Sequence, residues 1–461
     1  MIEKFTHKGL WFLPDNPDRQ VTGILTYDPS EGADLELLGT LVDHRSSKEI
    51  HEPDFILGYT TDNKAITLYK SYEYSRSFLS GIDTAKYTTN FILIGDHFTN
   101  EIEFKFDKVK GRFKNLDEWI SEFGFKEVEP DFKNKKIKID YELPSPIDFK
   151  INEHLSGKLN FTFSAPMMRY TNKVTVEQKS EVIFEVDEPL PFFNALDNLM
   201  LFQNFLTLGT FEPAYPISVW LSNKNRKDKD DENGSVTPVE LIYKPGFSYT
   251  EGKKKILWEF LFNYRDIKPN FETIIQKWFS QKDKIDPVTN LLFESFYHRT
   301  RFNESSFLNI VQALETFHRR FRKNEILPKQ EHKKRVADII ASVAADFKDW
   351  LKDRLNFSNE PTLHHRLVEL TNEVSNKTLS KIIKDKDQFI KETKNSRNYY
   401  THYDVSLEKK ALRGNDLFLL TEKLRVLLIA IVLLETGFTN EQVDGLFERN
   451  EFKFFNHMLG D

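Results

Sequence analysis

The sequence predicts an α+β protein of several domains, in which a β-rich N-terminal region precedes an all-α C-terminal region. Up to about residue 256, short aromatic or β-branched runs alternate with turn residues, as in antiparallel sandwiches and barrels. From about Leu257, apolar residues recur every three to four positions, which is typical of helices. A length of 461 residues is also more than one core usually holds. We therefore expect two to four domains.

The N-terminal region, residues 1–256, divides into two sets of expected strands. A short helix at 116–123 follows the first set, and a sub-boundary is expected near 125–135. A longer amphipathic helix is expected at 189–208, with a proline near its start and a glycine after its end. The charged run 225–235 predicts the exposed loop of a long hairpin. The expected strands are 9–13, 23–27, 34–38, 54–58, 65–69, 87–94, 101–106, 136–141, 159–163, 173–176, 181–186, 217–221 and 239–243.

The C-terminal region is expected to be helical throughout, with a connector at 257–300 and a helical domain at 301–461. The expected helices are 269–280, 287–298, 304–324, 329–353, 361–374, 378–402, 415–436 and 439–449. In the helix 415–436, the apolar residues alternate steps of three and four. This pattern indicates the core of a helical bundle.

Composition excludes several kinds of protein. The chain has no Cys, which excludes disulfides, thiolate catalysis and Cys-ligated metals and fits a reducing cytoplasm. Residues 1–8 lack the apolar stretch of a secretory signal, and the longest apolar run, 426–434, is too short for a bilayer, which needs about 20 residues. We therefore expect a cytoplasmic protein without membrane contact. A net charge of −6 argues against general nucleic-acid binding. The basic runs 318–323 and 329–335 are then either solvated helix faces or a local basic cleft.

The stretch best suited to chemistry is 395–404, near the end of an expected helix. A cation can hold the charge of a phosphate while an imidazole moves a proton, so Arg397 and His402 suit metal-free cleavage of a phosphodiester. On a regular helix, Asn398 lies about 40° from His402, whereas Arg397 is turned from it by about 140°. Either the helix ends or bends between Arg397 and His402, or the Arg and His of two chains meet across an interface.

The spacing of Arg397 and His402 is by itself a weak signal. A surface Arg paired with Asp404 or Glu392, and a His that caps carbonyls at a helix end, would give the same pattern. Glu315, on an apolar helix earlier in the chain, is either a partner of Arg397 or faces water. The sequence alone leaves these alternatives open.

Aromatic and basic side chains could complete a nucleic-acid site. Tyr399, Tyr400 and Tyr403 either stack on bases or pack in the bundle, and packing is expected for at least one of them. Arg319 and Arg320 are candidates for contacts with RNA phosphates. No carboxylate or His cluster at metal-ligand spacing and no glycine-rich phosphate loop is present in the sequence. We therefore expect no metal site and no cofactor.

Two segments carry a resemblance to a known family. Arg397-Asn398-x-x-x-His402 follows the helical segment 385–394 and precedes the helix 416–436, and it resembles the R-polar-x3-H signature of the HEPN ribonuclease superfamily. The helix at 307–315 resembles the opening helix of the ApeA-like HEPN group, in which a strand-rich domain precedes the HEPN domain. The resemblance covers most of the chain, closely over 300–440 and loosely before it. It implies that the all-α region is a HEPN helical bundle.

The resemblance implies a metal-independent RNA endonuclease in which Arg397, Asn398 and His402 are catalytic. It also implies RNA as substrate, with tRNA among the candidates, and a homodimer through the helical domain. The biological role implied is abortive defence against bacteriophage, with an unknown phage-derived trigger acting on the N-terminal region as sensor or regulator. The alternative is a non-catalytic module in which the helical domain dimerises and the Arg–His line only binds a nucleotide or RNA.

Overall fold

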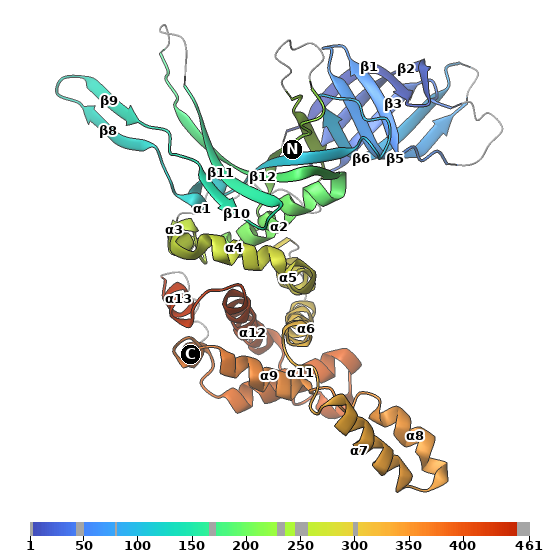
Figure 1. Cartoon of the computed structure of the whole chain (residues 1–461), viewed down its shortest axis with the longest axis vertical. Coiled ribbons are helices and arrows are strands. Elements are labelled where there is room, and N and C mark those ends of the chain that lie inside the picture. Colours follow the sequence, from blue (N-terminus) through green and yellow to red (C-terminus); the bar gives the residue numbers. More distant parts are fainter. Residues whose placement is uncertain are drawn as a thin grey trace. The chain divides into compact units, whose positions relative to one another are not determined.

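The computed structural model describes residues 3–42, 50–78, 81–165, 172–227, 236–244, 257–297 and 303–449. The chain divides into two compact units, Met1–Glu272 and Thr273–Asp461, called unit 1 and unit 2 below. Unit 1 is built mainly of strands and unit 2 of helices, which confirms the expected α+β class (Figure 1). Unit 1 includes residues 257–272, which the sequence analysis assigned to the helical connector.

Most elements of unit 1 are strands, and its α-helices are α1, α2 and α3. Their bounds are β1 (Phe5–Leu13), β2 (Asn16–Asp28), β3 (Gly32–Leu38), β4 (Phe55–Thr60), β5 (Ala65–Ser77), β6 (Thr84–Ile94), β7 (Lys105–Phe113), α1 (Leu116–Ile120), β8 (Phe125–Asp131), β9 (Lys136–Tyr141), β10 (Ile147–Lys150), β11 (Leu155–Ser164), β12 (Glu177–Pro191), α2 (Phe192–Thr210), β13 (Pro216–Ser222), β14 (Val239–Tyr243) and α3 (Tyr264–Ile267).

Unit 2 begins inside α4 (Phe271–Ser280), a helix that runs across the boundary. Its helices are α5 (Lys282–Tyr297), α6 (Asn303–Phe321), α7 (Lys329–Ala341), α8 (Ala345–Leu355), α9 (Leu363–Glu373), α10 (Asn376–Ile382), α11 (Lys386–His402), α12 (Gly414–Glu435) and α13 (Asn440–Leu446).

Among the described strands of unit 1, six close a barrel in the order β6-β3-β2-β1-β4-β5, and β5 pairs back to β6. Side chains alternate along these antiparallel strands, so that Ala33, Leu35 and Leu37 of β3 are buried while the residues between them are exposed. The fully buried ring of Trp11 lies against the backbone of β4, where a Cβ at Gly58 would come within 2.4 Å of it. The barrel-like antiparallel architecture expected from the sequence is therefore confirmed.

Strand β6 joins the barrel to a second sheet. Its outer edge pairs with β3 over residues 84–89 and with β14 over 91–94, and the ladder continues through β13, β7, β12, β11 and β10. Helix α2 covers β7 and β12, and its Phe202 contacts the rings of Phe113 and Phe184. The expected hairpin of β13 and β14 is confirmed by the pairing of Val219 with Leu241, and most of the loop 225–235 lies outside the described residues.

Several expected strands differ from the structure. Residues 173–176 are not a strand, and β8 and β10 were not expected. The strand expected at 101–106 begins only at Lys105, because the Asn100 side chain accepts hydrogen bonds from the backbone N–H groups of Ile102 and Glu103 and forms a turn. A side chain that offers the backbone a local partner in this way competes with strand formation.

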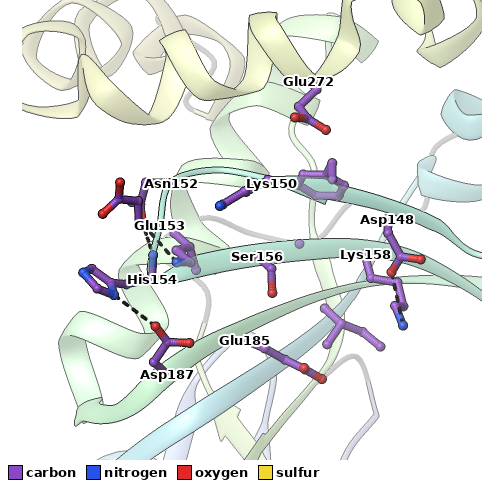
Figure 2. A pocket seen from close by; sticks show the side chains of 14 residues that line it. Asp148, Lys150, Asn152, Glu153, His154, Ser156, Lys158, Glu185, Asp187 and Glu272 are labelled. Carbon is purple, nitrogen blue, oxygen red and sulfur yellow. Dashed lines mark hydrogen bonds and ion pairs between the residues drawn. The ribbon is translucent and has the colours of Figure 1, made fainter.

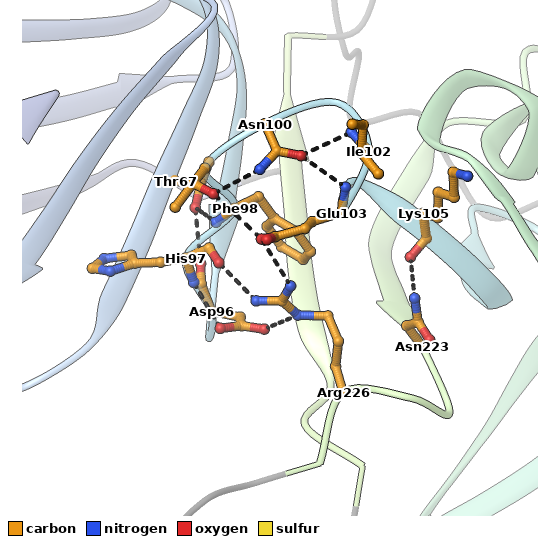
Figure 3. Close-up of polar contacts among 11 residues, drawn as sticks. Thr67, Asp96, His97, Phe98, Asn100, Ile102, Glu103, Lys105, Asn223 and Arg226 are labelled. Atoms are coloured by element: carbon orange, nitrogen blue, oxygen red, sulfur yellow. Dashed lines mark hydrogen bonds and ion pairs between the residues drawn. The ribbon is translucent and has the colours of Figure 1, made fainter. Parts of the chain in front are cut away.

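The same loop is held from across the chain by Arg226, at the base of the β13–β14 hairpin (Figure 3). The Arg226 guanidinium donates to the Asp96 carboxylate at 2.6 Å and to the His97 carbonyl at 2.7 Å. It also lies 4.5 Å from the centre of the Phe98 ring. Charge-assisted hydrogen bonds and a cation–π contact therefore connect the second sheet with the end of β6.

In unit 2, α12 is the central helix. Residues 426–433 are buried on every side of it, and α12 packs on α6. This confirms the expected bundle core, although the buried surface is wider than a single seam. Two expected helices are each broken in two: 329–353 is interrupted at 342–344, and 378–402 at 383–385. In the part of the chain that the structure describes, no helix is apolar over a long enough stretch to cross a bilayer.

Candidate functional site

Helix α11 carries Arg397, Asn398 and His402 in its last two turns. It begins at Asp385, whose side chain accepts a hydrogen bond from the backbone N–H of Gln388, and it runs without interruption to His402. It ends there because Tyr403 adopts the left-handed conformation, with φ of 49°. Of the two alternatives left open by the sequence, a bend or end of the helix between Arg397 and His402 is therefore not present, and the two side chains leave one regular helix about 140° apart.

Arg397 is held by a partner on another helix. Its guanidinium lies 3.4 Å from the Glu315 carboxylate of α6, and the two side chains are 32% and 21% exposed. A second guanidinium nitrogen donates to the Asn398 side-chain oxygen, also at 3.4 Å. The alternative partners are engaged elsewhere, since Glu392 accepts from Gln388 and Asp404 accepts from Ser406. Of the two options for Glu315, the structure places it beside Arg397.

His402 is exposed in the last turn of α11, where unpaired helix carbonyls favour a cation. The Asp404 carboxylate follows two residues later. Hydrogen bonds from the hydroxyl and N–H groups of Ser406 lower the pKa of Asp404, and the nearby His402 adds to this effect. The imidazole is thus accessible to a substrate, and the Asp404 carboxylate lies nearby.

The three tyrosines of this stretch differ in their surroundings. Tyr400 is buried, contacts the Phe307 ring, and donates its hydroxyl to the Leu412 carbonyl at 2.8 Å. This confirms that at least one of them packs in the bundle. Tyr399 is half-buried, whereas Tyr403 is 66% exposed. Tyr399 and Tyr403 therefore retain surface that a base could contact.

The segment after α11 folds back onto the site. The Leu412 N–H donates to the Ser396 hydroxyl at 3.0 Å, which fixes the start of α12 beside α11. The Arg413 guanidinium lies 5.5 Å from the centre of the Tyr399 ring and donates to its hydroxyl and to Glu408, both at 3.1 Å. Arg413 is a cation at this site that the sequence analysis missed, because only the tertiary fold brings it back to α11.

Of the two arginines proposed for RNA binding, Arg319 lies one turn beyond Glu315 on the same face of α6. It pairs with Glu360 at 2.9 Å. Arg320 is turned by about 100° from Arg319 and donates to the Asp283 carbonyl at 2.7 Å. Only Arg319 therefore shares a helix face with the partner of Arg397.

The remainder of the basic run 318–323 serves packing more than surface charge. Arg322 bridges Glu373 at 2.6 Å and Glu435 at 2.8 Å, and these hydrogen bonds raise its pKa. His318 is fully buried. Side chains that point inward with carboxylate partners cannot also hold phosphates, so this run is not a continuous basic cleft.

His318 is the centre of a buried polar chain. Arg366, which is 1% exposed, donates to His318 Nδ1 at 2.9 Å and to the Asn324 side chain at 2.6 Å. Because Nδ1 must accept, the ring proton lies on Nε2, which donates to Glu369 at 2.5 Å. Burial lowers the pKa of His318, and Arg366 acts in the same direction, whereas Glu369 opposes it. The sequence offered no signal for this arrangement.

The described residues contain no group of three or more His, Asp or Glu that could hold a metal ion. Unit 1 has a cavity of about 460 Å³ beside β10, β11 and β12 (Figure 2). Its charges are largely paired, with Lys158 at 3.2 Å from Asp148 and His154 at 3.0 Å from Asp187. The lining mixes carboxylates, lysines and a His, a combination that does not indicate one class of ligand.

Comparison with known protein families gives two matches. The model described as ApeA N-terminal domain 1 matches residues 6–278, and the model described as Apea-like HEPN matches residues 308–442. Comparisons with curated proteins and with solved structures returned no significant match. The second match contains α11 and Glu315, and the first spans the barrel and the second sheet. The resemblance drawn from the sequence is confirmed, and the chain belongs to the family of proteins that join an ApeA N-terminal domain to an ApeA-like HEPN domain.

Proposed function

We propose that this protein is a metal-independent RNA endonuclease of the HEPN type that acts in defence against bacteriophage. The observation that carries the proposal is the pair on α11, where Glu315 holds Arg397 and His402 stays open to solvent. HEPN domains are commonly ribonucleases. The substrate is RNA, with tRNA among the candidates.

In the proposed reaction, the 2′-hydroxyl of one nucleotide attacks the adjacent phosphorus, and the bond from phosphorus to the 5′-oxygen breaks. His402 moves the proton of the 2′-hydroxyl to the leaving 5′-oxygen, taking it first as a base and then giving it up as an acid. Arg397 stabilises the charge that develops on the phosphate oxygens, and Asn398 positions the phosphate. The product should carry a 2′,3′-cyclic phosphate. The guanidinium supplies the charge, so no metal is part of this route.

The working unit in this proposal is a homodimer that pairs about residues 397–402. Because α11 is regular through His402, one chain directs Arg397 and His402 to different sides. A two-fold axis beside α11 would place the Arg of one copy near the His of the other. Two such sites would also gather positive charge in a chain of net charge −6, where phosphates would be attracted.

Unit 1 is proposed to hold this activity in check until a phage-derived trigger binds it. A ribonuclease that cleaves cellular RNA must be restrained between infections, and unit 1 contributes no residue to the catalytic set. The alternative function is a non-catalytic module in which the HEPN domain dimerises and binds RNA or a nucleotide.

The decisive experiment incubates the purified full-length protein with total RNA in excess EDTA, beside the His402→Ala variant. Cleavage by the wild type alone, with cyclic phosphate ends, supports the nuclease. Cleavage that EDTA abolishes and Mg²⁺ restores contradicts the metal-free route. The same assay is repeated with protein from phage-infected cells, in which the trigger is present. RNA binding without cleavage in both assays favours the non-catalytic alternative.

A further inference from the structure

Arg413 places a guanidinium on the side of helix α11 that carries His402. On a regular helix Tyr399 is turned from His402 by about 60°, whereas Arg397 is turned from it by about 140°. The Arg413 guanidinium donates to the Tyr399 hydroxyl at 3.1 Å. Of the two arginines at the site, Arg413 rather than Arg397 therefore shares a side of the helix with His402 of the same chain.

The position of Arg413 is fixed through its neighbours. The residue before it, Leu412, donates its N–H to the Ser396 hydroxyl at 3.0 Å and accepts at its carbonyl from the Tyr400 hydroxyl at 2.8 Å. The Tyr399 ring lies 5.0 Å from the ring of Tyr400, which is buried. Both the backbone and the guanidinium are thus attached to α11, so that little freedom is lost when a ligand binds.

The Arg413 guanidinium keeps hydrogen-bond donors for a ligand. Its side chain is 55% exposed. The bonds to Tyr399 and Glu408 both come from the same nitrogen, Nη2. No acceptor for Nε or Nη1 lies in the part of the chain that the structure describes. A guanidinium presents its donors as a planar fork, and this geometry matches the oxygens of a phosphate.

The segment 403–413 carries both signs of charge, with an excess of one positive charge. Its cations are Lys409, Lys410 and Arg413, and its carboxylates are Asp404 and Glu408. Asp404 accepts a hydrogen bond within its own turn, and Glu408 accepts from Arg413. Lys409 and Lys410 are exposed, and neither has a carboxylate partner among the described residues. In a chain of net charge −6, this segment favours an anionic ligand.

The start of helix α12 lies at the same point. The helix begins at Gly414, and no side chain caps it, so its first N–H groups also favour an anion. Two carboxylates oppose this effect. Asp416 lies in the first turn of α12, and Glu304 of α6 adds to the effect of burial in raising the pKa of Tyr400. The balance suits the single charge of a phosphodiester better than the several charges of a free nucleotide.

We propose that Arg413 binds a phosphate of the RNA strand next to the one that is cleaved, on the His402 side of the site. The phosphate displaces Glu408 from the guanidinium, and Tyr399 keeps the guanidinium in place. Arg413 thereby orients the strand so that the reacting 2′-hydroxyl lies at His402. This inference rests on the proposed RNA substrate, and it assigns Arg413 to binding and not to the chemical step.

The first test measures RNA affinity in the full-length His402→Ala chain, in which binding is separated from cleavage. The probe is a fluorescently labelled single-stranded RNA of mixed sequence, titrated at several NaCl concentrations. Adding Arg413→Gln should weaken binding about tenfold. The slope of log affinity against log salt should fall by about 0.7, the effect of one lost phosphate contact on a single strand. Lys410→Gln, which removes the same charge from the same segment, is the matched control and should nearly keep the parent slope.

The outcomes separate this inference from the proposed function. If the His402→Ala chain binds RNA and Arg413→Gln leaves the affinity unchanged, the inference alone is wrong. Equal losses in the Arg413 and Lys410 variants would also overturn it, because the charge of the segment would then be responsible. If the His402→Ala chain binds no RNA, the proposed function fails together with the inference. The melting temperature of Arg413→Gln should match the parent, since an exposed ion pair contributes little stability.

The second test replaces the competing carboxylate. Glu408→Gln, again in the His402→Ala chain, should strengthen RNA binding, because the phosphate no longer has to displace a carboxylate from Arg413. If Arg413 serves only to hold the segment 403–413 through Glu408, the melting temperature falls and RNA affinity does not rise, which overturns the proposal. Glu441→Gln, at an exposed position of α13, controls for the change in net charge.

The third test uses the cleavage-competent chain. Arg413→Gln should raise KM and leave kcat near the wild-type value, because a phosphate that does not react is held equally in the bound substrate and in the transition state. Arg397→Ala should instead lower kcat. A lower kcat at unchanged KM in Arg413→Gln would place Arg413 at the reacting phosphate and contradict its assignment to the neighbouring one.

Discussion

Glu315 gives Arg397 a defined position without closing it off. At 3.4 Å the contact is longer than a tight charge-assisted hydrogen bond, and both side chains keep some exposure. A phosphate arriving at the site could therefore take over part of the guanidinium. In the proposed site Glu315 would position Arg397, although it lies 82 residues earlier in the sequence.

At the residue scale, the first prediction concerns Arg397 and His402, the pair proposed to be catalytic. Arg397→Ala and His402→Ala should each reduce RNA cleavage at least about 10²-fold, the usual scale for loss of an acid–base group or of charge stabilisation. Cleavage of a labelled RNA and thermal melting are the measurements. Lys394→Ala is the matched control, because it removes an exposed cation from the same helix. If the control loses as much activity as the two variants, net charge and not specific chemistry is responsible.

A second residue-scale prediction uses the buried His318. Its pKa in the folded chain is lowered below the unfolded value of about 6.5, so the unfolded chain binds the extra proton first as pH falls. The stability associated with neutral His318 is complete above about pH 6.5 and is lost as pH drops below it. His318→Gln should make the stability of the chain less dependent on pH between about 5 and 7, since Gln can accept from Arg366 and donate to Glu369 without titrating.

The measurement is denaturant unfolding of both proteins at several pH values. His154→Gln, which replaces an exposed His of unit 1, is measured beside it for comparison. Burial also lowers the pKa values of His7 and His97, so the wild-type slope contains their contributions and only the difference between variants reports on His318. If His318→Gln keeps the full wild-type slope, protonation of His318 does not contribute to the pH dependence of stability.

At the element scale, Asn359 joins the two ends of the helical arm that α7 and α8 form at residues 329–355. Asn359→Ala removes the two side-chain hydrogen bonds to Leu327 and should cost about 1 to 3 kcal/mol in a partly buried site. Hydrogen exchange of the α7 and α8 amides should accelerate, while that of α12 should change little. Asn356→Ala, at the exposed end of α8, serves for comparison. Uniform acceleration through unit 2 would mean that the arm does not open separately.

The two broken helices show what the sequence could predict about the elements. The break before α11 had a visible signal, since Asp385 and Gln388 stand at the spacing of a helix cap. The break at 342–344 had none, because no Gly or Pro interrupts the periodic pattern there. Strand β10 was missed because its four residues are too short for a pattern of alternation to be detected. Tertiary pairing, and not local propensity, makes it a strand.

The candidate site was likewise predictable only in part, because only some of its contacts are local in sequence. Residues 397–402 are local in sequence, and their spacing on a helix follows from periodicity. Arg413 folds back across a loop, and the pKa of His318 is lowered by burial and by Arg366 from another helix. Both follow from contacts between distant segments, which a pattern of spacing does not contain.

At the scale of the whole molecule, mixed chains test whether the site is shared. Neither Arg397→Ala nor His402→Ala protein alone should cleave RNA. If Arg and His come from different copies, a mixed dimer keeps one complete site, and an equal mixture should recover about a quarter of wild-type activity. The mixture is incubated until subunits exchange and is then assayed in EDTA. No recovery, with exchange verified by cross-linking, would place both residues of each site in one chain.

Strand β6 has a further consequence for unit 1. Because one edge of this strand pairs with β5 and the other with β3 and then β14, the barrel cannot be separated from the outer sheet without breaking a continuous ladder. In that ladder β14 and β13 lie nearest the barrel, whereas β10, β11 and β12 form the outer edge. In the sequence, however, β13 and β14 come after β10, β11 and β12. Residues 1–272 should accordingly melt in a single calorimetric transition. Proteolysis between β9 and β10 should leave two fragments that stay together under native conditions and part only in denaturant.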